Sequence, residues 1–225
     1  FEPIIDLKNS HDSYLIDQRN GDEYLDMFSM YASGAVGYNH PYIVKHKDIL
    51  GDIAINKTTL SDIYNTYYAE FIEVFNKIAV PKHLKHAFFI DGGSLAVENA
   101  LKAAFDWKKR HNLNKGVKKD GDKVIYFNQA FHGRSGYTLT LTNTSDPRKT
   151  MYFPKLPWFR VDNPKLTFPV NEDVLKDVSN KEKNAIAQIS NIISNNPNDI
   201  AAIIIEPIQG EGGDNHFRDD FMMFL

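Results

Sequence analysis

Two short apolar runs separated by a long helical pattern constrain the fold more than any other feature of this sequence. Lys123–Phe127 and Ile200–Ile205 are rich in the β-branched and aromatic residues that favour strands. Between them, five apolar residues recur at helical spacing: Ala185, Ile186, Ile189, Ile192 and Ile193. Strands that alternate with helices pair in parallel, because the helix returns the chain to the edge from which it started. The sequence therefore predicts an α/β fold, with a mostly parallel sheet that has helices on both faces.

Further segments extend this pattern. Ala87–Ile90 is a short apolar run that predicts another buried strand, and an alanine-rich helix follows from Leu95 to about Arg110. Tyr137–Thr144 alternates threonine with apolar residues, and a period of two predicts a strand. Tyr152–Pro169 holds four prolines and several aromatic residues, so we expect an extended loop packed on the surface.

The first third of the chain follows a different pattern. Tyr14–Asp17 and Glu23–Met27 are apolar-rich runs joined by a turn that contains Asn20-Gly21. Asn-Gly favours a β-hairpin, because both residues tolerate positive φ. Met30–Pro41 predicts a loop of small and aromatic residues, and Leu60–Ala79 has the apolar spacing of a helix. We expect a small α+β segment ahead of the parallel sheet.

The composition excludes several classes of protein. There is no cysteine, so disulfides, cysteine-ligated metals and a thiol nucleophile are excluded, and we expect no metal site. A net charge of −3 gives no general basic field for nucleic acid. No run approaches the roughly 18 apolar residues that a membrane span needs. These features suit a cytoplasmic protein with neither kind of partner.

The last residues, Arg218–Leu225, have the pattern of an amphipathic helix that stops without a cap or stop signal. We infer that the C-terminal part of a longer protein is missing.

Gly92-Gly93-Ser94 is the first candidate site. Here an apolar run leads directly into a helix, whose first N–H groups carry a partial positive charge and can hold a phosphate group. A serine at this position can donate to a phosphate oxygen or cap the helix. For this segment alone, a tight turn with an N-cap serine is the more common outcome.

Phe131-His132-Gly133-Arg134 is the second candidate, just beyond the run Lys123–Phe127. An aromatic ring, an imidazole and a guanidinium between glycines could supply a stacking face and a fork for a carboxylate. Taken alone, a solvated arginine and a structural histidine are the more common outcome.

Glu206 and Glu211 form the third candidate, beyond the run Ile200–Ile205. A carboxylate at the end of a core strand is costly unless it is paired or lines a polar cavity, but both glutamates could equally be solvated. All three candidates follow predicted strands, and the carboxyl ends of parallel strands meet at one edge. Together they suit an anionic cofactor with a flat ring and an acidic substrate.

At these residues the sequence resembles the class III aminotransferases, which are fold type I enzymes that use pyridoxal 5'-phosphate. Within that family it is most similar to the enzymes that act on the terminal amine of L-lysine. The stretches that carry the resemblance are Tyr24–Phe28, Gly92–Trp107, Ala130–Leu139, Glu206–Gly213 and His216–Arg218.

The resemblance implies roles for individual residues. Gly93 and Ser94 would hold the cofactor phosphate, Phe131 would stack on the pyridine ring with His132 beside it, and Glu206 would line the pocket. In substrate binding, Arg134 would pair with the α-carboxylate of lysine and then with a carboxylate of 2-oxoglutarate. Glu211 would pair with a downstream arginine and swing away when 2-oxoglutarate binds.

The resemblance also implies what lies outside these residues. The lysine that forms the Schiff base is expected downstream of Leu225, so we expect no catalytic residue here and predict that this segment alone is inactive. Residues 1–60 would belong to a small domain and an interface loop, and 61–225 to the first part of the large cofactor-binding domain. A homodimer with shared active sites is implied. The family favours a helix, not a strand, over Tyr137–Thr142.

Two alternatives stay open. 4-Aminobutyrate and ornithine also present a terminal amine and a distant carboxylate, so Arg134 does not distinguish them from lysine. In a different class of function, a transaminase fold could serve as a non-catalytic binding module. The apolar residues between Met27 and Tyr38 would suit either a dimer interface or a core.

Overall fold

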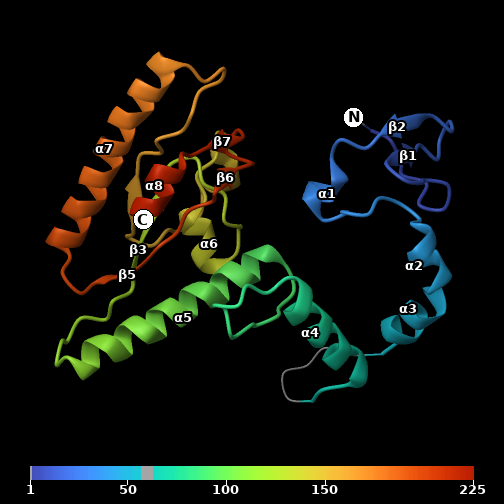
Figure 1. Ribbon diagram of the computed structural model, residues 1–225, viewed down its shortest axis with the longest axis horizontal. Helices are drawn as coiled ribbons and strands as arrows, with labels where there is room; N and C mark the ends of the chain where they lie inside the picture. Colours follow the sequence, from blue (N-terminus) through green and yellow to red (C-terminus); the bar gives the residue numbers. More distant parts are fainter. Residues whose placement is uncertain (1, 57–62) are drawn as a thin grey trace. The chain divides into compact units, whose positions relative to one another are not determined.

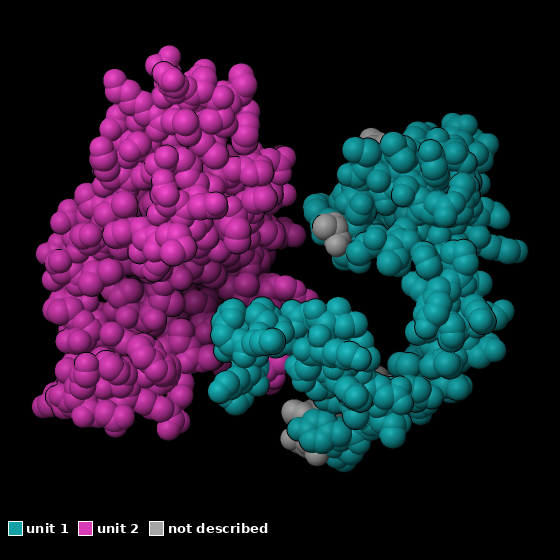
Figure 2. All heavy atoms as spheres, in the orientation of Figure 1, with its two compact units in different colours: residues 1–86 teal, residues 87–225 magenta. Residues whose placement is uncertain are grey.

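The computed structural model describes residues 2–56 and 63–225 (Figure 1). The chain divides into two compact units, residues 1–86 and 87–225 (Figure 2). The predicted domain boundary between residues 60 and 61 lies outside the described residues, as does the beginning of the helix predicted over Leu60–Ala79.

A three-stranded parallel sheet lies at the centre of the second unit. β3 (Lys123–Phe127) is the middle strand, between β4 (Phe159–Val161) and β5 (Ile200–Ile203). The same residue of β3, Ile125, lies opposite Phe159 of β4 and Ile203 of β5. The predicted parallel sheet is confirmed, and β3 has the predicted bounds.

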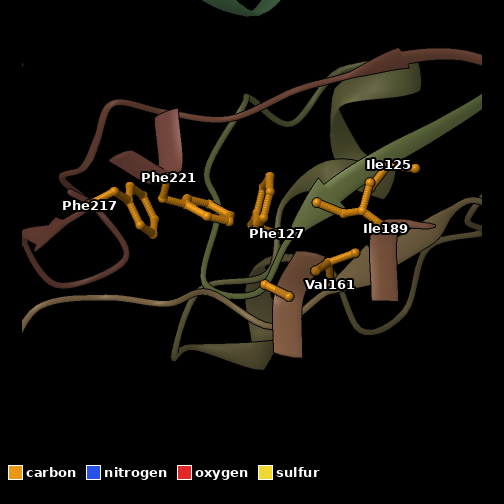
Figure 3. Packing of buried hydrophobic residues seen from close by; sticks show 7 residues of the cluster. Ile125, Phe127, Val161, Ile189, Phe217 and Phe221 are labelled. Carbon is orange, nitrogen blue, oxygen red and sulfur yellow. The ribbon is translucent and has the colours of Figure 1, made fainter. Parts of the chain in front are cut away.

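One face of the sheet packs against α7 (Glu172–Asn195) and α8 (Asp219–Phe224). Figure 3 shows the Phe127 side chain between Phe221 of α8 and Ile125 of β3. The Phe127 and Phe221 rings meet edge-on, with centroids 5.9 Å apart. Full burial of one such side chain contributes roughly 2–3 kcal/mol. The buried residues of this cluster are Ile125, Phe127, Val161, Ala185, Ile189, Phe217 and Phe221.

The other face packs against α5 (Gly93–Asn114) and α6 (Gly136–Leu141). Alternate residues of a strand point to opposite faces, so Val124 and Tyr126 lie on this side. The buried residues of this second cluster are Leu101, Val124, Tyr126 and Leu141. Helices therefore cover both faces of the sheet, as predicted.

α7 is fixed at both its start and its middle. Asn171 caps it, because the Asn171 side chain accepts a hydrogen bond from Val174 N at 2.9 Å. The buried carboxylate of Glu182 accepts two hydrogen bonds from Arg218, at 2.8 Å from Nε and 2.5 Å from the terminal nitrogen. This bidentate pair ties α7 to the start of α8.

The strand predicted for Ala87–Ile90 is wrong, because these residues form no strand. β4 and β5, the outer strands of the described sheet, pair only with β3. Phe88 is 67% exposed. Apolar composition predicts a tendency to be buried, but a strand also needs an edge with which to pair.

The strand predicted for Tyr137–Thr144 from its period of two is also wrong, and the helix favoured by the resemblance is confirmed as α6. Thr138, Thr140 and Thr142 are all buried. Thr140 accepts a hydrogen bond from Leu156 N at 3.0 Å, and Thr142 donates one to Gly133 O at 2.6 Å. The alternating threonines therefore do not mark a solvent face.

Two predicted boundaries need smaller corrections. The loop expected over Tyr152–Pro169 contains β4, because Val161 is fully buried in the core beside β3. The strand expected over Ile200–Ile205 ends at Ile203 and is half-buried along its length. A short 3₁₀ helix, η1 (Pro147–Lys149), precedes the loop.

The first unit contains the predicted hairpin. β1 (Tyr14–Ile16) and β2 (Glu23–Leu25) are antiparallel, with Ile16 opposite Glu23. Gly21 in the turn has a φ of 79°, which glycine adopts at low cost.

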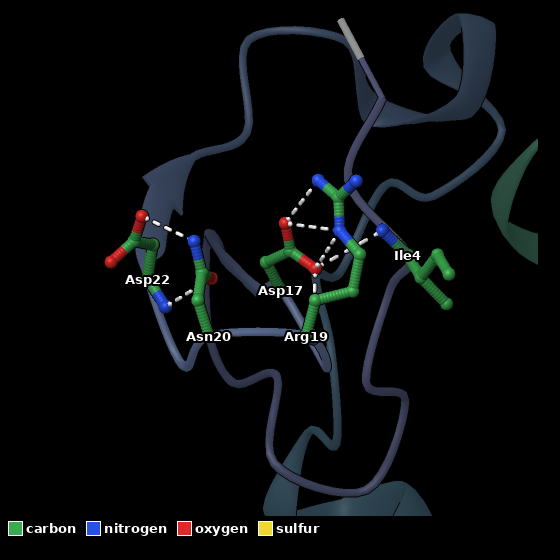
Figure 4. A network of polar contacts seen from close by, with 5 residues as sticks. All are labelled: Ile4, Asp17, Arg19, Asn20 and Asp22. Atoms are coloured by element: carbon green, nitrogen blue, oxygen red, sulfur yellow. Dashed lines mark hydrogen bonds and ion pairs between the residues drawn. The ribbon is translucent and has the colours of Figure 1, made fainter.

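A buried carboxylate organises this hairpin (Figure 4). Asp17 accepts hydrogen bonds from the side chain of Arg19, the closest at 2.7 Å, and from Ile4 N at 3.2 Å. The Arg19 hydrogen bonds, with backbone donors beside them, hold the pKa of the Asp17 carboxyl far below its usual range. The carboxylate is therefore ionised near neutral pH and keeps its charged partner Arg19.

The other elements of the first unit are helical. They are α1 (Ser29–Ala32), α2 (Pro41–Lys45), α3 (Lys47–Ala54) and α4 (Thr66–Ile78). Met30 and Tyr31 in α1 have positive φ, so this element is an irregular turn and not a regular helix. Among the described residues of the chain, no helix is long and apolar enough to cross a membrane.

Candidate functional site

Loops that follow adjacent strands meet at the carboxyl edge of the sheet. The loop after β3 carries Phe131, and the loop after β5 carries Glu206. Phe131 N donates a hydrogen bond to Glu206 Oε1 at 2.8 Å. Burial raises the pKa of the half-buried Glu206 carboxyl, and the Phe131 hydrogen bond opposes that shift. The two predicted candidates are therefore in direct contact.

The beginning of α5 faces open space. Gly92 is the N-cap residue with a φ of 83°, and no side chain caps the helix. A Cβ atom added at Gly92 or Gly93 would meet nothing within 4 Å. The first N–H groups of a helix have no partner within the helix, so they are available to an anion from outside.

Ser94 does not cap this helix, so the N-cap alternative is wrong for this residue. It lies within the first turn, and its Oγ is 2.6 Å from Ser135 Oγ and 3.0 Å from Thr138 Oγ1. Ser135 is the N-cap residue of α6, and Thr138 lies in its first turn. Ser94 thus joins the start of α5 to the start of α6.

Gly133 packs directly on Ser94. Its φ is 120°, and a Cβ there would overlap the side chains of Ser94 and Thr138. Thr142 bridges the same turn, because its Oγ1 accepts from His132 N at 3.1 Å and donates to Gly133 O at 2.6 Å. The structure therefore brings Ser94 and the turn that carries Arg134 together.

His132 is buried, with 7% of its surface exposed. Burial lowers the pKa of its imidazole to about 4, so the ring is neutral near pH 7. Its Nε2 is buried and has no hydrogen-bond partner among the described residues. Buried polar atoms are usually paired, so this atom suits a site that takes a ligand.

The two predicted substrate residues differ in their surroundings. Arg134 is exposed, and its guanidinium forms no ion pair within residues 2–56 and 63–225. Glu211 lies in the turn between β6 (Ile208–Gln209) and β7 (Asn215–His216), and its carboxylate pairs with Lys149 of η1. Lys149 was not among the predicted site residues. The predicted partner of Glu211, a downstream arginine, stays a prediction.

A cluster of amide side chains supports this turn and was also missed. Asn215 donates to Gln209 Oε1 at 2.9 Å, and Asn163 donates to the same atom at 2.9 Å. Gln209 in turn donates to Asn128 O at 2.9 Å. A Cβ at Gly212 would overlap the Gln129 carbonyl, so the glycine next to Glu211 is a sequence signal that could have been recognised.

Comparisons with known proteins agree with this architecture. Residues 2–225 match the family described as "Aminotransferase class-III". The chain is 45% identical to the L-lysine-epsilon aminotransferase of Mycobacterium tuberculosis over 222 residues, which is 97% of this chain and 49% of that protein. It is 31% identical to the 4-aminobutyrate aminotransferase of Schizosaccharomyces pombe, over 96% of this chain and 49% of that protein.

A solved structure of a lysine aminotransferase from M. tuberculosis superimposes with a TM-score of 0.92 at 44% identity, over 99% of this chain and 51% of that one. The chain therefore has the fold of that aminotransferase, and it spans about half the length of the curated relatives that it matches.

Proposed function

The chain belongs to the class-III aminotransferases, and from that premise we propose that the protein moves the terminal amino group of L-lysine onto 2-oxoglutarate. The products are 2-aminoadipate 6-semialdehyde and L-glutamate, and the cofactor is pyridoxal 5'-phosphate. The similarity to lysine aminotransferases at 45% identity, against 31% for a 4-aminobutyrate enzyme, supports lysine as the donor.

The residues present fit this cofactor. The start of α5 offers backbone N–H groups to a phosphate where Gly92 and Gly93 leave open space, and His132 Nε2 is a buried polar atom available to a ligand. Gly93 and Ser94 would hold the phosphate, Phe131 would stack on the ring, and Glu206 would line the pocket. When bound, pyridoxal phosphate supplies an electron sink for chemistry at the carbon that bears the amine.

The residues of this chain would bind the cofactor and orient the carboxylate of each substrate. His132 is neutral, so it adds no cation beside the ring. Glu206 holds the backbone of Phe131 in place through a hydrogen bond at 2.8 Å. The exposed Arg134 can form a bidentate pair with the carboxylate of each substrate in turn. Glu211 adds a carboxylate that pairs with Lys149. Because this ion pair is partly exposed, separating its two charges costs little free energy.

One observation carries the proposal. Ser94, the Phe131–Arg134 turn and Glu206 come from three separate segments and meet through direct contacts at one edge of a parallel sheet. Ligands bind at this edge in open α/β sheets.

The test is turnover by the full-length protein with pyridoxal phosphate. Glutamate formation from 2-oxoglutarate should depend on lysine, and lysine should exceed ornithine and 4-aminobutyrate in kcat/KM by at least about tenfold, or about 1.4 kcal/mol. A higher kcat/KM with 4-aminobutyrate or ornithine would favour that alternative enzyme. No turnover with any of the three would favour the non-catalytic binding module.

Substitution of Arg134 tests its part. Arg134→Gln should lower kcat/KM for lysine and for 2-oxoglutarate by roughly 30- to 150-fold, because a charge-assisted hydrogen bond contributes about 2–3 kcal/mol. Arg148→Gln, at an exposed arginine paired with Asp146, is the matched control and should leave both values unchanged. Equal effects of the two substitutions on kcat/KM would show that Arg134 does not bind the substrate carboxylates.

The proposal includes assembly and location. A homodimer with shared active sites is supported by apolar residues that the first unit leaves exposed, including Met27 at 86% and Tyr31 at 83%. Such patches often mark interfaces between proteins. We place the protein in the cytoplasm, and sedimentation of the full-length protein would test the dimer.

A further inference from the structure

Glu98 in α5 contacts the start of α6, next to Ser94, and was not predicted as a site residue. Its Oε1 accepts a hydrogen bond from Ser135 Oγ at 2.9 Å and another from Thr138 N at 3.0 Å. A glutamate side chain thus accepts from a first-turn N–H group of α6, beside the capping box that Ser135 and Thr138 form. Because an ionised carboxylate only accepts, both bonds run toward Glu98.

This acceptor fixes the direction of the neighbouring hydrogen bonds. A hydroxyl group has one hydrogen to donate. Ser135 gives its hydrogen to Glu98, so in the 2.6 Å contact between Ser94 Oγ and Ser135 Oγ the donor is Ser94. Thr138 Oγ1 accepts from Ser135 N at 3.0 Å, and its own hydrogen can point to Ser94 Oγ.

The single hydrogen of Ser94 is therefore directed into the protein and away from a ligand. A phosphate at the start of α5 needs donors, and the Ser94 hydroxyl presents only lone pairs to it. The backbone N–H groups of Gly93 and Ser94 remain as the donors at this helix end.

The same hydroxyl touches the turn that carries Arg134. Gly133 lies so close to Ser94 that a Cβ would overlap its side chain, and Thr142 donates a hydrogen bond to the Gly133 carbonyl. A displacement of Ser94 therefore displaces the residue before Arg134. A shift of about 1 Å in a binding group can weaken its interaction strongly.

We propose that Glu98, acting through Ser135, orients the Ser94 hydroxyl so that it positions the Gly133–Arg134 turn and does not bind the cofactor. The cofactor phosphate is held by backbone N–H groups. This inference rests on the proposed function, because it takes Arg134 as the carboxylate-binding residue. Glu98, Ser135 and the Ser94 hydroxyl are positioning residues, since they act on substrate only through the Gly133–Arg134 turn.

Ser94→Ala separates the two roles of this residue, because it removes the hydroxyl and keeps the N–H group. In the full-length protein, the dissociation constant of pyridoxal phosphate should stay within about threefold of wild type. Glutarate is an unreactive dicarboxylate whose binding can be monitored by the absorbance of the bound cofactor. Its dissociation constant should rise about tenfold, which corresponds to the free energy of one hydrogen bond. The KM values for lysine and 2-oxoglutarate should rise with it. Ser190→Ala, at an exposed serine of α7, is the matched control.

Glu98 is tested by the pair Glu98→Gln and Glu98→Ala. Glutamine keeps an acceptor oxygen for Ser135 and Thr138 and should restore glutarate affinity to within about threefold of wild type, whereas alanine should weaken it about tenfold. Glu172→Gln in the first turn of α7 controls for loss of charge.

Each outcome decides the inference. A tenfold or greater loss of pyridoxal phosphate affinity in Ser94→Ala overturns it, because the hydroxyl would then bind phosphate. Unchanged affinities for both ligands also overturn it. If Ser94→Ala does not fold, Ser135→Ala breaks the same link and is judged by the same two affinities. A wild-type protein that binds both ligands but does not turn over lysine would refute the proposed function and leave this inference intact.

Discussion

The two units of the molecule differ in how they keep apolar side chains from water. In residues 87–225, β3 is covered on both faces, and Ile125 and Phe127 have no exposed surface. In residues 1–86, Leu15 is the one large apolar side chain that is buried among the described residues. The first unit is ordered instead by polar and backbone contacts such as those of Asp17 (Figure 4). A unit can therefore be well defined locally without a core of its own.

Core truncation should give the largest effect and could break this comparison. Phe127→Ala should lower the free energy of unfolding of the second unit by about 4 kcal/mol, because it removes a fully buried ring. The matched change Phe28→Ala, at a ring 49% exposed, should cost about 1 kcal/mol in the first unit. Hydrogen exchange resolved to each unit measures both. Equal losses would mean that Phe28 is covered as well as Phe127.

A glycine substitution sharpens the role of backbone contacts in the first unit. Gly37 has a φ of 72°, and a Cβ there would overlap the Asp12 carbonyl beside the Asp12–Tyr38 bridge. Gly37→Ala should cost about 3 kcal/mol of local stability. Gly51→Ala in α3, where a Cβ meets nothing within 4 Å, should be neutral or stabilising. Similar exchange rates in the two variants would contradict the account.

The pH dependence should distinguish the units through His132. The pKa of His132 is about 4 in the folded protein and about 6.5 when unfolded, so the unfolded state takes up a proton first as the pH falls. The second unit should lose about 2 kcal/mol between pH 7 and pH 5 from this group. Urea denaturation at both pH values should show a smaller loss in His132→Gln, whereas replacement of the exposed His11 by glutamine should leave the wild-type loss. An unchanged loss in His132→Gln would show that His132 protonates freely in the folded state.

The smallest effect is expected at the ion pair of Glu211. Lys149→Gln should change the free energy of unfolding by about 0.5 kcal/mol, and added salt should reduce the difference, because the pair is partly exposed. Lys181→Gln, in an exposed pair with Asp177, is the matched control. A loss above about 2 kcal/mol for Lys149→Gln alone would mean that the pair holds the Glu211 turn in place, which would oppose exchange of partners there.

Sequence alone predicted the parts of the fold that depend on local pattern. Lys123–Phe127 is apolar on both faces because helices cover both, so its pattern identified the strand correctly. The local pattern failed where contacts with distant segments determine the secondary structure. Ala87–Ile90 is apolar but not in the sheet, and the buried threonines of α6 are satisfied by hydrogen bonds to other segments that no local pattern contains.

The candidate site shows the same division. Glycines and charged groups after apolar runs identified Ser94, the Phe131–Arg134 turn and Glu206, and the structure brings them together, although the run before Ser94 is not a strand. Glu98 was missed, because a glutamate within a helix usually lies on the solvated face. Its position four residues after Ser94 does place the two side chains on one face of α5, and that spacing was a usable signal.

The alternating packing of β3 has a practical consequence for anyone who modifies this protein. Insertion or deletion of one residue inside Lys123–Phe127 would turn every following side chain of the strand to the opposite layer. The Phe127 ring would then be aimed at the helices that now receive Val124 and Tyr126. Affinity tags, reporter insertions and chain-splitting sites therefore belong in the charged segment 115–120, before the strand begins, and never within it.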